Sequence, residues 1–458
     1  MRRAPLPDLS QTFDAVVVGT GPGGATVARE LARRGWNVLI LERGGMQKIT
    51  GSMAQALREL WMPGRGLVLA ERALAILRAI TVGGGSIYSW GTAWDPPFEL
   101  FDRYGIDLRE HAAEAQRELN VAPLPPSQLG PAARRILQSA ADLGFDWRPL
   151  PKFLNQSRLG GRLMGTYGAP TYDAKWTARV FVSEAVARGA TLITHARVRR
   201  VFKKRHTARS VEVIYRGRAR AVYARKIVLA AGGLGTPVIL QASGLRRAGR
   251  TLFCDPLVAV AGTLPGPSHG QELPMTAGAL FPDDGYLLAD LSLPPWLYAL
   301  VAGEVGRVDR LAAWPHTGMV LVKIRDELKG RVNRNGTVRK PLSEADRQRL
   351  AEGTDRAKAI LAHAGARKIF HSWTFAAHPG GTAPIGRVVD ADLQTELKNL
   401  YICDASVIPE PWGLPPALSL IALGKHLAVR LARAEHPVIS QIAHPAPPAG
   451  PEHHAPGA

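Results

Sequence analysis

Residues Phe13–Gly45, FDAVVVGTGPGGATVARELARRGWNVLILERGG, have the pattern of a complete strand, turn, helix and strand. The apolar run 15–18 is typical of a buried parallel strand, and the run 38–41 predicts a second one. Between them lies an amphipathic helical pattern that Gly35 is placed to end. Together these parts predict a βαβ unit, and with it a Rossmann-type α/β domain.

Three glycines follow the first predicted strand with the spacing G-x-G-x-x-G, namely Gly19, Gly21 and Gly24. In such a motif the first glycine makes the tight turn, the second lets a pyrophosphate approach the backbone, and the third lets helix and strand pack closely. The helix N-terminus then faces the phosphates. Glu42 ends the second strand, where an acid that binds a ribose is expected. We therefore expect an adenine dinucleotide here, and the motif alone does not distinguish FAD from NAD.

The composition is that of an ordinary globular protein. The chain has 458 residues, of which 46% are hydrophobic and 21% charged, which allows two or three domains that share segments. Cys254 and Cys403 are its only cysteines, so a disulfide framework is excluded and no metal site is expected. No signal-peptide core precedes the first strand and no run of roughly 18 apolar residues follows, so we expect a cytoplasmic protein.

Further along the chain, two glycine-rich stretches carry information. The segment Thr81–Gly91 has three consecutive glycines followed by small hydroxyl side chains, which leaves backbone N–H groups free to meet an anion or a ring edge. The segment Lys226–Gly244 repeats the order of strand, glycine turn and helix, with Pro237 in the first helical turn, so the chain returns there to the dinucleotide domain. The stretch 70–80 has apolar residues at helical spacing, which predicts a helix.

The part from 255 to 374 changes character. Its short alternating strands, followed by a helix at 343–364, are typical of a mainly antiparallel sheet with one open face, and we expect a substrate domain. The apolar run 291–301 is suited to line a greasy channel. The tail 436–458 is rich in Pro, Ala and His, and we expect it to be disordered.

These segments, in this order, resemble the glucose-methanol-choline (GMC) family of flavin oxidoreductases over nearly the whole chain. The likeness rests on the unit Gly19–Glu42, the loop Gly83–Ser89, the signature Ala230-Ala-Gly-x-x-x-Thr-Pro237 with Ser243-Gly244, the element His378-x-x-Gly-Thr382 and the segment Asp404-Ala-Ser-Val-Ile-Pro409. The resemblance implies a Rossmann-type FAD-binding domain, discontinuous in sequence, and a mainly antiparallel α+β substrate domain. We expect the first to comprise 1–100, 185–254 and 375–435, and the second 101–184 and 255–374.

The resemblance also implies roles for individual residues. Glu42 is expected to bind the adenosine ribose of FAD, Val198 to lie near the adenine, and His378 to be the catalytic base. The other expected cofactor contacts are Gly19, Gly21, Gly24, Gly84, Gly85, Ser86, Ala231, Gly232, Asp404, Ala405 and Pro416. Two positions depart from the family pattern: Pro415 stands where many members have His or Asn, and Ser89 where many have Asn.

The chemistry fits these residues. Oxidation of an alcohol requires removal of the hydroxyl proton while hydride leaves the carbon, and an imidazole with a pKa near ~6.5 accepts such a proton at neutral pH. The helix expected to begin near Pro416 is placed to stabilise negative charge on a reduced flavin.

We therefore expect an FAD-dependent oxidoreductase that oxidises a CH–OH group of an apolar alcohol, with His378 as base. A dehydrogenase is favoured over an oxidase because no sequence feature argues for oxygen use, and the electron acceptor is left open. Two alternatives remain: other flavin chemistry on a lipid or carboxylated substrate, and a flavin-binding electron-transfer protein without alcohol chemistry.

The net charge of +20 is concentrated in one segment. Between Arg197 and Arg250, fifteen Lys and Arg residues stand against a single acid, Glu212. They lack the aromatic interleaving and the motifs of a nucleic-acid site, so no nucleic-acid partner is expected. Each basic residue near an anionic bilayer contributes about 1 kcal/mol, so we expect peripheral attachment to anionic membranes, with simple solvation of the charges as the alternative.

Overall fold

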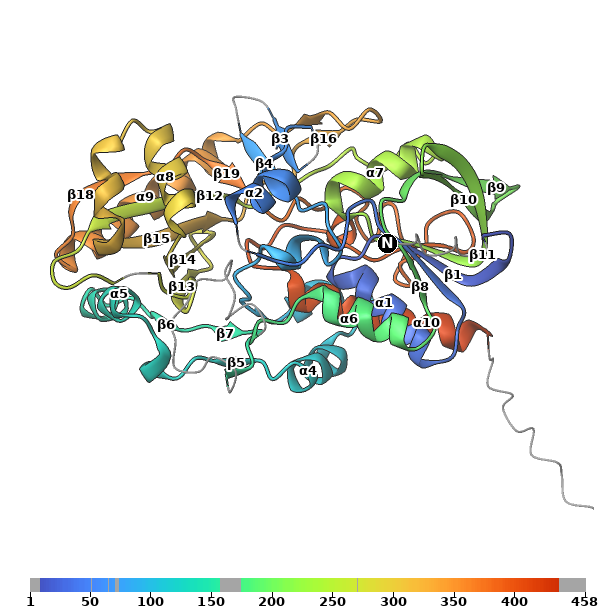
Figure 1. The fold of residues 1–458 in the computed structure, drawn as a ribbon, viewed down its shortest axis with the longest axis horizontal. Coiled ribbons are helices and arrows are strands. Elements are labelled where there is room, and N and C mark those ends of the chain that lie inside the picture. Colours follow the sequence, from blue (N-terminus) through green and yellow to red (C-terminus); the bar gives the residue numbers. More distant parts are fainter. Residues whose placement is uncertain are drawn as a thin grey trace, which may run out of the picture.

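The computed structural model describes residues 9–50, 52–64, 66–70, 74–156, 174–269 and 271–435. Two β-sheets dominate the molecule, one toward each end of its longest axis (Figure 1). The tail 436–458, which the sequence predicts to be disordered, lies outside the described residues.

The first sheet is of the Rossmann type and contains the predicted βαβ unit. Its strands run in the order β8 (Thr191–Ile193), β2 (Val38–Leu41), β1 (Thr12–Val18), β11 (Arg218–Leu229), β10 (Thr207–Tyr215) and β9 (Arg197–Lys204), and β20 (Leu400–Ile402) also pairs with β11. β1 runs parallel to β2 and β11, whereas β9 and β10 are antiparallel neighbours. The long β11 joins the antiparallel and the parallel part of this sheet, because its first half forms a hairpin with β10 and its second half pairs with β1 and β20.

Helices α1 (Pro22–Arg33), α6 (Ala178–Ala187) and α10 (Ala417–Glu435) lie together below this sheet in Figure 1. A buried ion cluster fixes them to α4 (Arg109–Glu118). The fully buried Arg29 of α1 contacts Glu118 of α4 at 2.6 Å, and Lys425 of α10 reaches the same carboxylate at 3.1 Å. On another side of the sheet, α7 (Gly232–Ala242) packs against β9.

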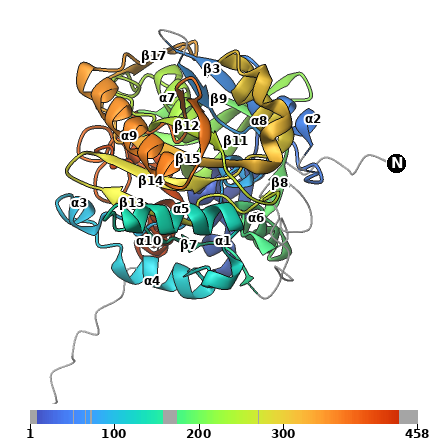
Figure 2. The same ribbon diagram turned by 90° about the vertical axis from the view of Figure 1, so that its left-hand side faces the viewer.

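The second sheet is mainly antiparallel, as the alternating pattern predicts. Its strands run in the order β3 (Leu67–Leu69), β4 (Ala75–Leu77), β19 (Phe375–Ala376), β12 (Pro256–Thr263), β15 (Thr317–Ile324), β14 (Tyr286–Leu291), β13 (Ala277–Phe281) and β6 (Arg148–Pro149), and β18 (Arg367–His371) also pairs with β12. Alternate residues enter two cores. One core includes α5 (Pro131–Asp142) and α9 (Glu344–His363), and the other includes α8 (Pro295–Glu304), which lies on the opposite side of the sheet (Figure 2).

Short elements connect these layers. They are α2 (Met53–Ala56) with the π-helix Leu57–Trp61, the 3₁₀-helices Gly84–Ile87, Pro126–Gln128, Val308–His316 and Ala405–Val407, α3 (Phe98–Asp102), and the two-stranded ribbons β5 (Ala122–Pro123) with β7 (Pro151–Lys152) and β16 (Arg331–Val332) with β17 (Val338–Arg339).

Two expectations about secondary structure are wrong. The stretch 70–80, predicted as a helix, contains the strand β4, because Ile76 is fully buried and β4 pairs with β3 and β19, a tertiary contact that outweighs local periodicity. The stretch 191–201, TLITHARVRRV, has a pattern that predicts one strand, but a turn in which His195 has a φ of 54° divides it into β8 and β9.

The domain boundaries stay a prediction, to which the packing adds two observations. β3 and β4, within 1–100, extend the second sheet, and α4, within 101–184, packs against α10 of the Rossmann region. Within the described ranges, no helix has the length and hydropathy needed to cross a membrane. The same part of the chain contains no group of three or more His, Cys, Asp or Glu placed to hold a metal ion.

Candidate active site

The glycine turn that follows β1 and the loop Gly83–Ser89 meet at the carboxyl ends of β1 and β2. The hydroxyl of Thr20 donates to Oε2 of Glu42 at 2.6 Å and accepts the N–H of Gly83 at 3.1 Å. A Cβ atom added to Gly84 would lie 3.1 Å from the Cα of Gly21, so the second loop packs directly on the first turn.

The glycines of these loops are of two kinds. At Gly19, Gly23 and Gly24 an added Cβ would come within 2.2 to 2.4 Å of a backbone oxygen, so the packing of the protein itself requires glycine. At Gly21 and Gly85 an added Cβ would meet no atom within 4 Å. Helix α1 also begins here without a side-chain cap. Open space before Gly21, at an uncapped helix N-terminus, and before Gly85, in the adjoining loop, fits the close approach of a dinucleotide phosphate.

Glu42 is buried at the end of β2. Its Oε1 accepts the N–H of Gly44 at 2.7 Å, and its Oε2 accepts the N–H of Thr20 at 3.2 Å. Burial raises the pKa of Glu42, and these hydrogen bonds oppose the rise. The carbonyl of Glu42 accepts the N–H of Ala196 at 2.8 Å, two residues before Val198, which is buried in β9.

Asp404, just after β20, ties the C-terminal segment to the start of α7. Its Oδ2 accepts the N–H of Gly232 at 2.8 Å and the hydroxyl of Thr236 at 2.5 Å, and its Oδ1 accepts the N–H of Ser406 at 2.8 Å. Burial raises the pKa of Asp404 against the effect of these hydrogen bonds. The structure thus gathers the expected cofactor residues in two groups, Gly19, Gly21, Gly24, Glu42 and Gly84, and Ala231, Gly232, Asp404 and Ala405.

Two buried polar side chains hold the loop after Gly83: Ser86, which was expected to contact the cofactor, and Lys175, which the sequence analysis missed. The hydroxyl of Ser86 donates to Gly83 O at 2.6 Å and accepts the N–H of Ala178 at 2.9 Å, so it is used within the protein. Lys175 donates to the carbonyls of Ile87 and Ser89 at 2.9 and 2.6 Å. Burial lowers the pKa of Lys175 to about 7. These contacts fix the backbone that faces the cofactor space.

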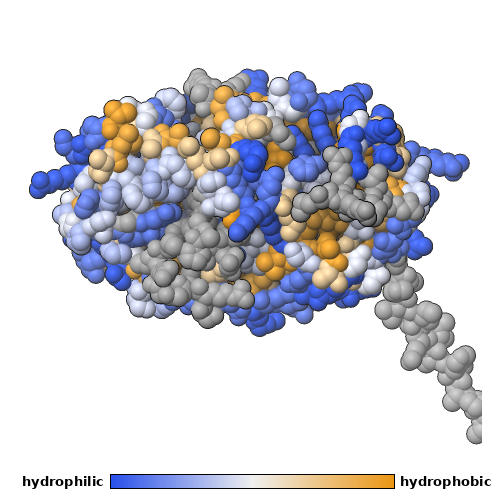
Figure 3. Space-filling model, in the orientation of Figure 1, coloured by the Kyte–Doolittle hydropathy of each residue, from blue (hydrophilic) through white to orange (hydrophobic). Residues whose placement is uncertain are grey.

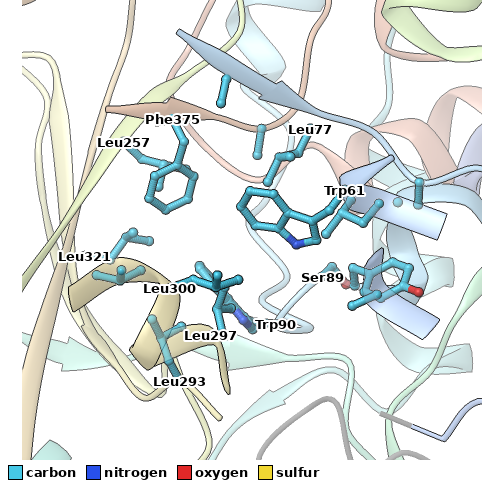
Figure 4. Close-up of a pocket in the computed structure, with 18 of the residues that line it drawn as sticks. Trp61, Leu77, Ser89, Trp90, Leu257, Leu293, Leu297, Leu300, Leu321 and Phe375 are labelled. Carbon is cyan, nitrogen blue, oxygen red and sulfur yellow. The ribbon is translucent and has the colours of Figure 1, made fainter. Parts of the chain in front are cut away.

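A cavity of about 650 Å³ adjoins this loop. Gly85, Ser89, His378 and Pro415 belong to its wall, so the glycine loop and the expected base share one space. The rest of the wall is largely apolar and includes Leu77, Leu257, Leu293, Leu297, Leu300, Leu321, Phe375, Trp61, Trp90, Trp296 and Trp373. Figure 4 shows the leucines of α8 on one side of this space and Trp61 on another.

The apolar run 291–301 therefore supplies part of the cavity wall, as its composition predicts. Among the tryptophans, Trp90 and Trp373 line the cavity, whereas Trp412 packs edge-on against Phe101 in the core. Helix α10 begins beside the cavity, since Pro415 lines it and the carbonyl of Pro416 accepts the N–H of Leu420 in the first helical turn.

His378 stands two residues after β19, at the cavity wall, with a left-handed φ of 58°. Its side chain is 29% exposed, and its Nδ1 lies 3.3 Å from Oδ2 of Asp255. Lys323 donates to the same oxygen at 2.7 Å. Burial lowers the pKa of His378, the hydrogen bond with Asp255 raises it, and the positive charge of Lys323 lowers it. The ring is therefore neutral at neutral pH and able to accept a proton.

The sequence analysis missed Asp255 and Lys323, although Lys323 leaves a signal. In β15 the side chains alternate between two cores, and Met319, Leu321 and Lys323 share one face. A lysine at a core position of an apolar strand requires a buried partner. Asp255 leaves no comparable signal, because a polar residue before a strand is ordinary.

Two family models cover most of the chain. The N-terminal GMC oxidoreductase model matches residues 13–258, and the C-terminal one matches residues 337–424. The chain is 27% identical to a GMC-type oxidoreductase of Mycobacterium tuberculosis, over 91% of its own length and 75% of that protein. It is 22% identical to the long-chain-alcohol oxidase FAO1 of Arabidopsis thaliana, over 92% of its own length and 66% of that protein.

Solved structures share the fold. Pyridoxine 4-oxidase from Mesorbium loti superposes with a TM-score of 0.69 at 19% identity, and the alignment covers 92% of this chain and 99% of that one. Formate oxidase of Aspergillus oryzae superposes with a TM-score of 0.67 at 16% identity, and covers 93% and 99%. The expected α/β fold with a Rossmann-type FAD domain is thereby confirmed. The chain belongs to the GMC oxidoreductase family of FAD-dependent alcohol oxidoreductases.

Proposed function

We propose that this enzyme oxidises a long-chain or otherwise apolar primary alcohol, and that His378 removes the hydroxyl proton. The observation that carries the proposal is the cavity: His378 and the glycine loop open into one largely apolar space of about 650 Å³. An alcohol whose hydroxyl meets His378 would place its alkyl chain against leucine and tryptophan side chains. Burial of each methylene is worth about 0.8 kcal/mol, so such a wall selects long apolar substrates.

The rim of the cavity supports an apolar substrate too. Leu57, Leu300 and Trp373 line the cavity and are exposed by 43%, 43% and 63%. Hydrophobic surface gathers over α8 in Figure 3. Exposed apolar side chains at an entrance lower the cost of transferring an alkyl chain from a carrier or a lipid surface. The relative named long-chain-alcohol oxidase agrees with this substrate class.

The cofactor contacts follow from the two groups of residues described above. We propose that the turn formed with Gly19 and Gly24 receives the pyrophosphate at Gly21, that Glu42 binds the ribose, and that Val198 borders the adenine. FAD, when bound, supplies the acceptor for the hydride. The remaining proposed contacts are Gly84, Gly85, Ser86, Ala231, Gly232, Asp404, Ala405 and Pro416.

His378 would act as the base for three reasons. Its ring reaches the cavity, its pKa is lowered so that it is unprotonated at neutral pH, and its other ring nitrogen is held by a carboxylate. A positioned base contributes about 10²- to 10⁴-fold to proton transfer. The uncharged Pro415 offers no second acceptor at the position where many family members have a polar side chain.

The test is anaerobic mixing of the enzyme with dodecanol, followed by the bleaching of oxidised flavin. We expect His378→Ala to keep its flavin and to lose about 10²- to 10⁴-fold in the rate of bleaching. The exposed His371→Ala is the matched control and should retain the wild-type rate. Equal rates for His378→Ala and wild type would exclude His378 as the base, and absence of bleaching by any alcohol would favour an electron-transfer protein.

A carboxylated lipid is the second candidate substrate, because Arg78 lines the same cavity. Burial, with the positive charges of Arg43 and Arg197 nearby, lowers the pKa of Arg78 to about 10, so the side chain remains cationic at neutral pH. A hydroxy fatty acid that reduces the flavin faster than the alcohol of equal length would favour this substrate. Oxygen consumption during turnover would separate an oxidase from the dehydrogenase that the sequence analysis favours.

We further propose that the basic segment attaches the enzyme to anionic membranes. Of its fifteen Lys and Arg residues all except Lys226 are exposed, and hydrophilic surface covers β9–β11 at the right of Figure 3. Cosedimentation with anionic vesicles at low salt, lost at high salt and absent with neutral vesicles, is the expected result. Equal binding to both kinds of vesicle, or binding to neither, would contradict attachment of the basic segment to anionic membranes.

A further inference from the structure

We propose that Asp255 and Lys323 act together as a positioning pair for His378: the carboxylate accepts the N–H at Nδ1, and Nε2 therefore presents its lone pair to the cavity. The inference rests on the proposed role of His378 as base.

The register of the second sheet brings the three side chains together. β12 pairs with β19 so that Pro256 is opposite Ala376, which places Asp255 beside the residues that lead to His378. β12 also pairs with β15, where Leu257 is opposite Lys323. Residues from three distant segments thus converge because their strands are neighbours.

The contacts define the state of the ring. A carboxylate only accepts hydrogen bonds, so the Nδ1 that faces Oδ2 of Asp255 must carry the proton in the neutral ring. Asp255 is 2% exposed whereas the side chain of His378 is 29% exposed, so the accessible part of the ring lies away from the carboxylate. Nε2 is thereby left as the acceptor on the cavity side.

Lys323 completes the arrangement. Its ammonium group, 2% exposed, donates to Asp255 Oδ2 at 2.7 Å and to the carbonyl of Gly413 at 2.7 Å. The lysine balances the buried carboxylate, so the ring is held by a carboxylate without sitting next to an unbalanced negative charge. Through Gly413 it also fixes the segment that leads to Pro415 and α10.

The backbone around the pair is held in an uncommon conformation. Asp255 and His378 are non-glycine residues with left-handed φ values of 48° and 58°. The N–H of Asp255 donates to Asp326 at 3.0 Å, and Asp326 is paired with Lys340 at 2.7 Å, both fully buried. Left-handed residues that a surrounding network holds in place are characteristic of functional sites.

The charged groups that face the ring are few. Asp255 reaches it from the start of β12 and Lys323 from β15. The other titratable side chains that line the cavity are Arg78, Tyr88 and Glu304. Tyr88 donates to Glu59 at 2.8 Å, and Glu304 accepts the N–H of Trp373 at 2.9 Å. The pair is thus the main electrostatic influence on His378.

The first measurement is NMR of the holoenzyme with isotope-labelled histidine, with His378→Ala used to assign the signal among thirteen histidines. We expect the neutral ring of His378 to carry its proton on Nδ1 in the wild type and to lose that preference in Asp255→Ala. A proton on Nε2 in the wild type would overturn the proposal. This readout does not depend on turnover.

The second measurement is the pH dependence of anaerobic flavin reduction. Reduction needs a neutral His378, so the rate falls as pH drops through its pKa. The acid limb of the pH–rate profile is the pH range in which this fall occurs. Lys323→Met removes a charge that lowers the pKa of His378, so it should move the acid limb to higher pH by about one pH unit. Asp255→Asn removes a group that raises the pKa, so the limb should move down, with a loss of about tenfold in rate.

Lys425→Met is the matched control, because Lys425 is also 2% exposed and ion-paired, at 2.8 Å from Glu114, but lies in α10 away from His378. It should leave the acid limb in place.

The double variant Asp255→Asn, Lys323→Met removes both buried charges and guards against misfolding of the single variants. If Asp255→Asn and Lys323→Met move the limb no further than Lys425→Met does, the pair is only structural. If instead His378→Ala reduces flavin normally, the proposed base fails while the NMR result still decides how the ring is held.

Discussion

The glycine turn after β1 and the cavity beside it are built in opposite ways. The turn is made of consecutive residues, and at Gly19, Gly23 and Gly24 the approach of backbone atoms leaves no room for a side chain. The cavity collects side chains from the second sheet, from the π-helix Leu57–Trp61, from α8 and from the C-terminal segment. A close backbone approach can be met by one residue type only, whereas many apolar side chains can line a cavity. The glycine turn can therefore be recognised from a short stretch of sequence, whereas the cavity cannot.

The largest expected effects come from substitutions within the glycine turn, where they distinguish a glycine required by packing from one required by the cofactor. Gly23→Val would drive Cβ to 2.2 Å from the carbonyl oxygen of Cys403, and we expect a loss of about 3 kcal/mol or more in stability. At Gly21 an added Cβ meets no atom within 4 Å and the φ of −64° suits any residue, so the Gly21→Val protein should fold and lose FAD. Thermal unfolding and the flavin absorbance of the purified variants measure the two effects.

A Gly21→Val protein with full flavin content would contradict the assignment of Gly21 to cofactor binding. In that case the open space before Gly21 is not where the pyrophosphate lies. A Gly23→Val protein as stable as the wild type would equally show that the turn tolerates a side chain.

The cavity wall provides the next test. Leu300→Asp places a charge on a lining residue that is 43% exposed, and Leu311→Asp does so on a residue of 42% exposure outside the lining. We expect the first to lower kcat/KM for dodecanol roughly tenfold, since burial against a leucine is worth about 1.5 kcal/mol, and the second to leave it unchanged. Equal effects of the two variants would show that the alkyl chain does not pass α8.

The smallest expected effect concerns Pro415. Pro415→Asn places a polar side chain in the cavity wall to which His378 also belongs, and one added hydrogen bond to the hydroxyl should raise flavin reduction by short alcohols about threefold. Stopped-flow reduction with ethanol measures this effect. A clear fall in rate, with flavin intact, would show instead that the proline shapes the pocket for a substrate that asparagine obstructs.

The fold could be predicted from the sequence where local patterns coincide with tertiary contacts. The βαβ unit and α9 are examples, because α9 begins with a capping box in which Ser343 and Asp346 satisfy each other's backbone N–H groups. The strand β4 could not be predicted, since its apolar spacing fits a helix and only the pairing with β3 and β19 makes it a strand.

The candidate site shows the same limit. His378 was identified because it belongs to a motif with fixed spacing, and the structure places it at the cavity wall. Asp255 and Lys323 belong to no motif, and 68 positions along the chain separate the two partners of this buried ion pair. Trp61 and Trp296 were also missed, because an apolar wall leaves no spacing rule in the sequence.

The measurement that tests the proposed function most directly is the dependence of anaerobic flavin reduction on alcohol chain length. A series of unbranched primary alcohols is mixed with the enzyme, and the second-order rate constant of bleaching is determined for each. An apolar cavity that takes up the alkyl chain predicts a rise of up to about fourfold per added methylene, the equivalent of about 0.8 kcal/mol, until the cavity is filled. Rate constants that do not change with chain length, or reduction by glycerol or choline as fast as by dodecanol, would contradict an apolar alcohol as the substrate.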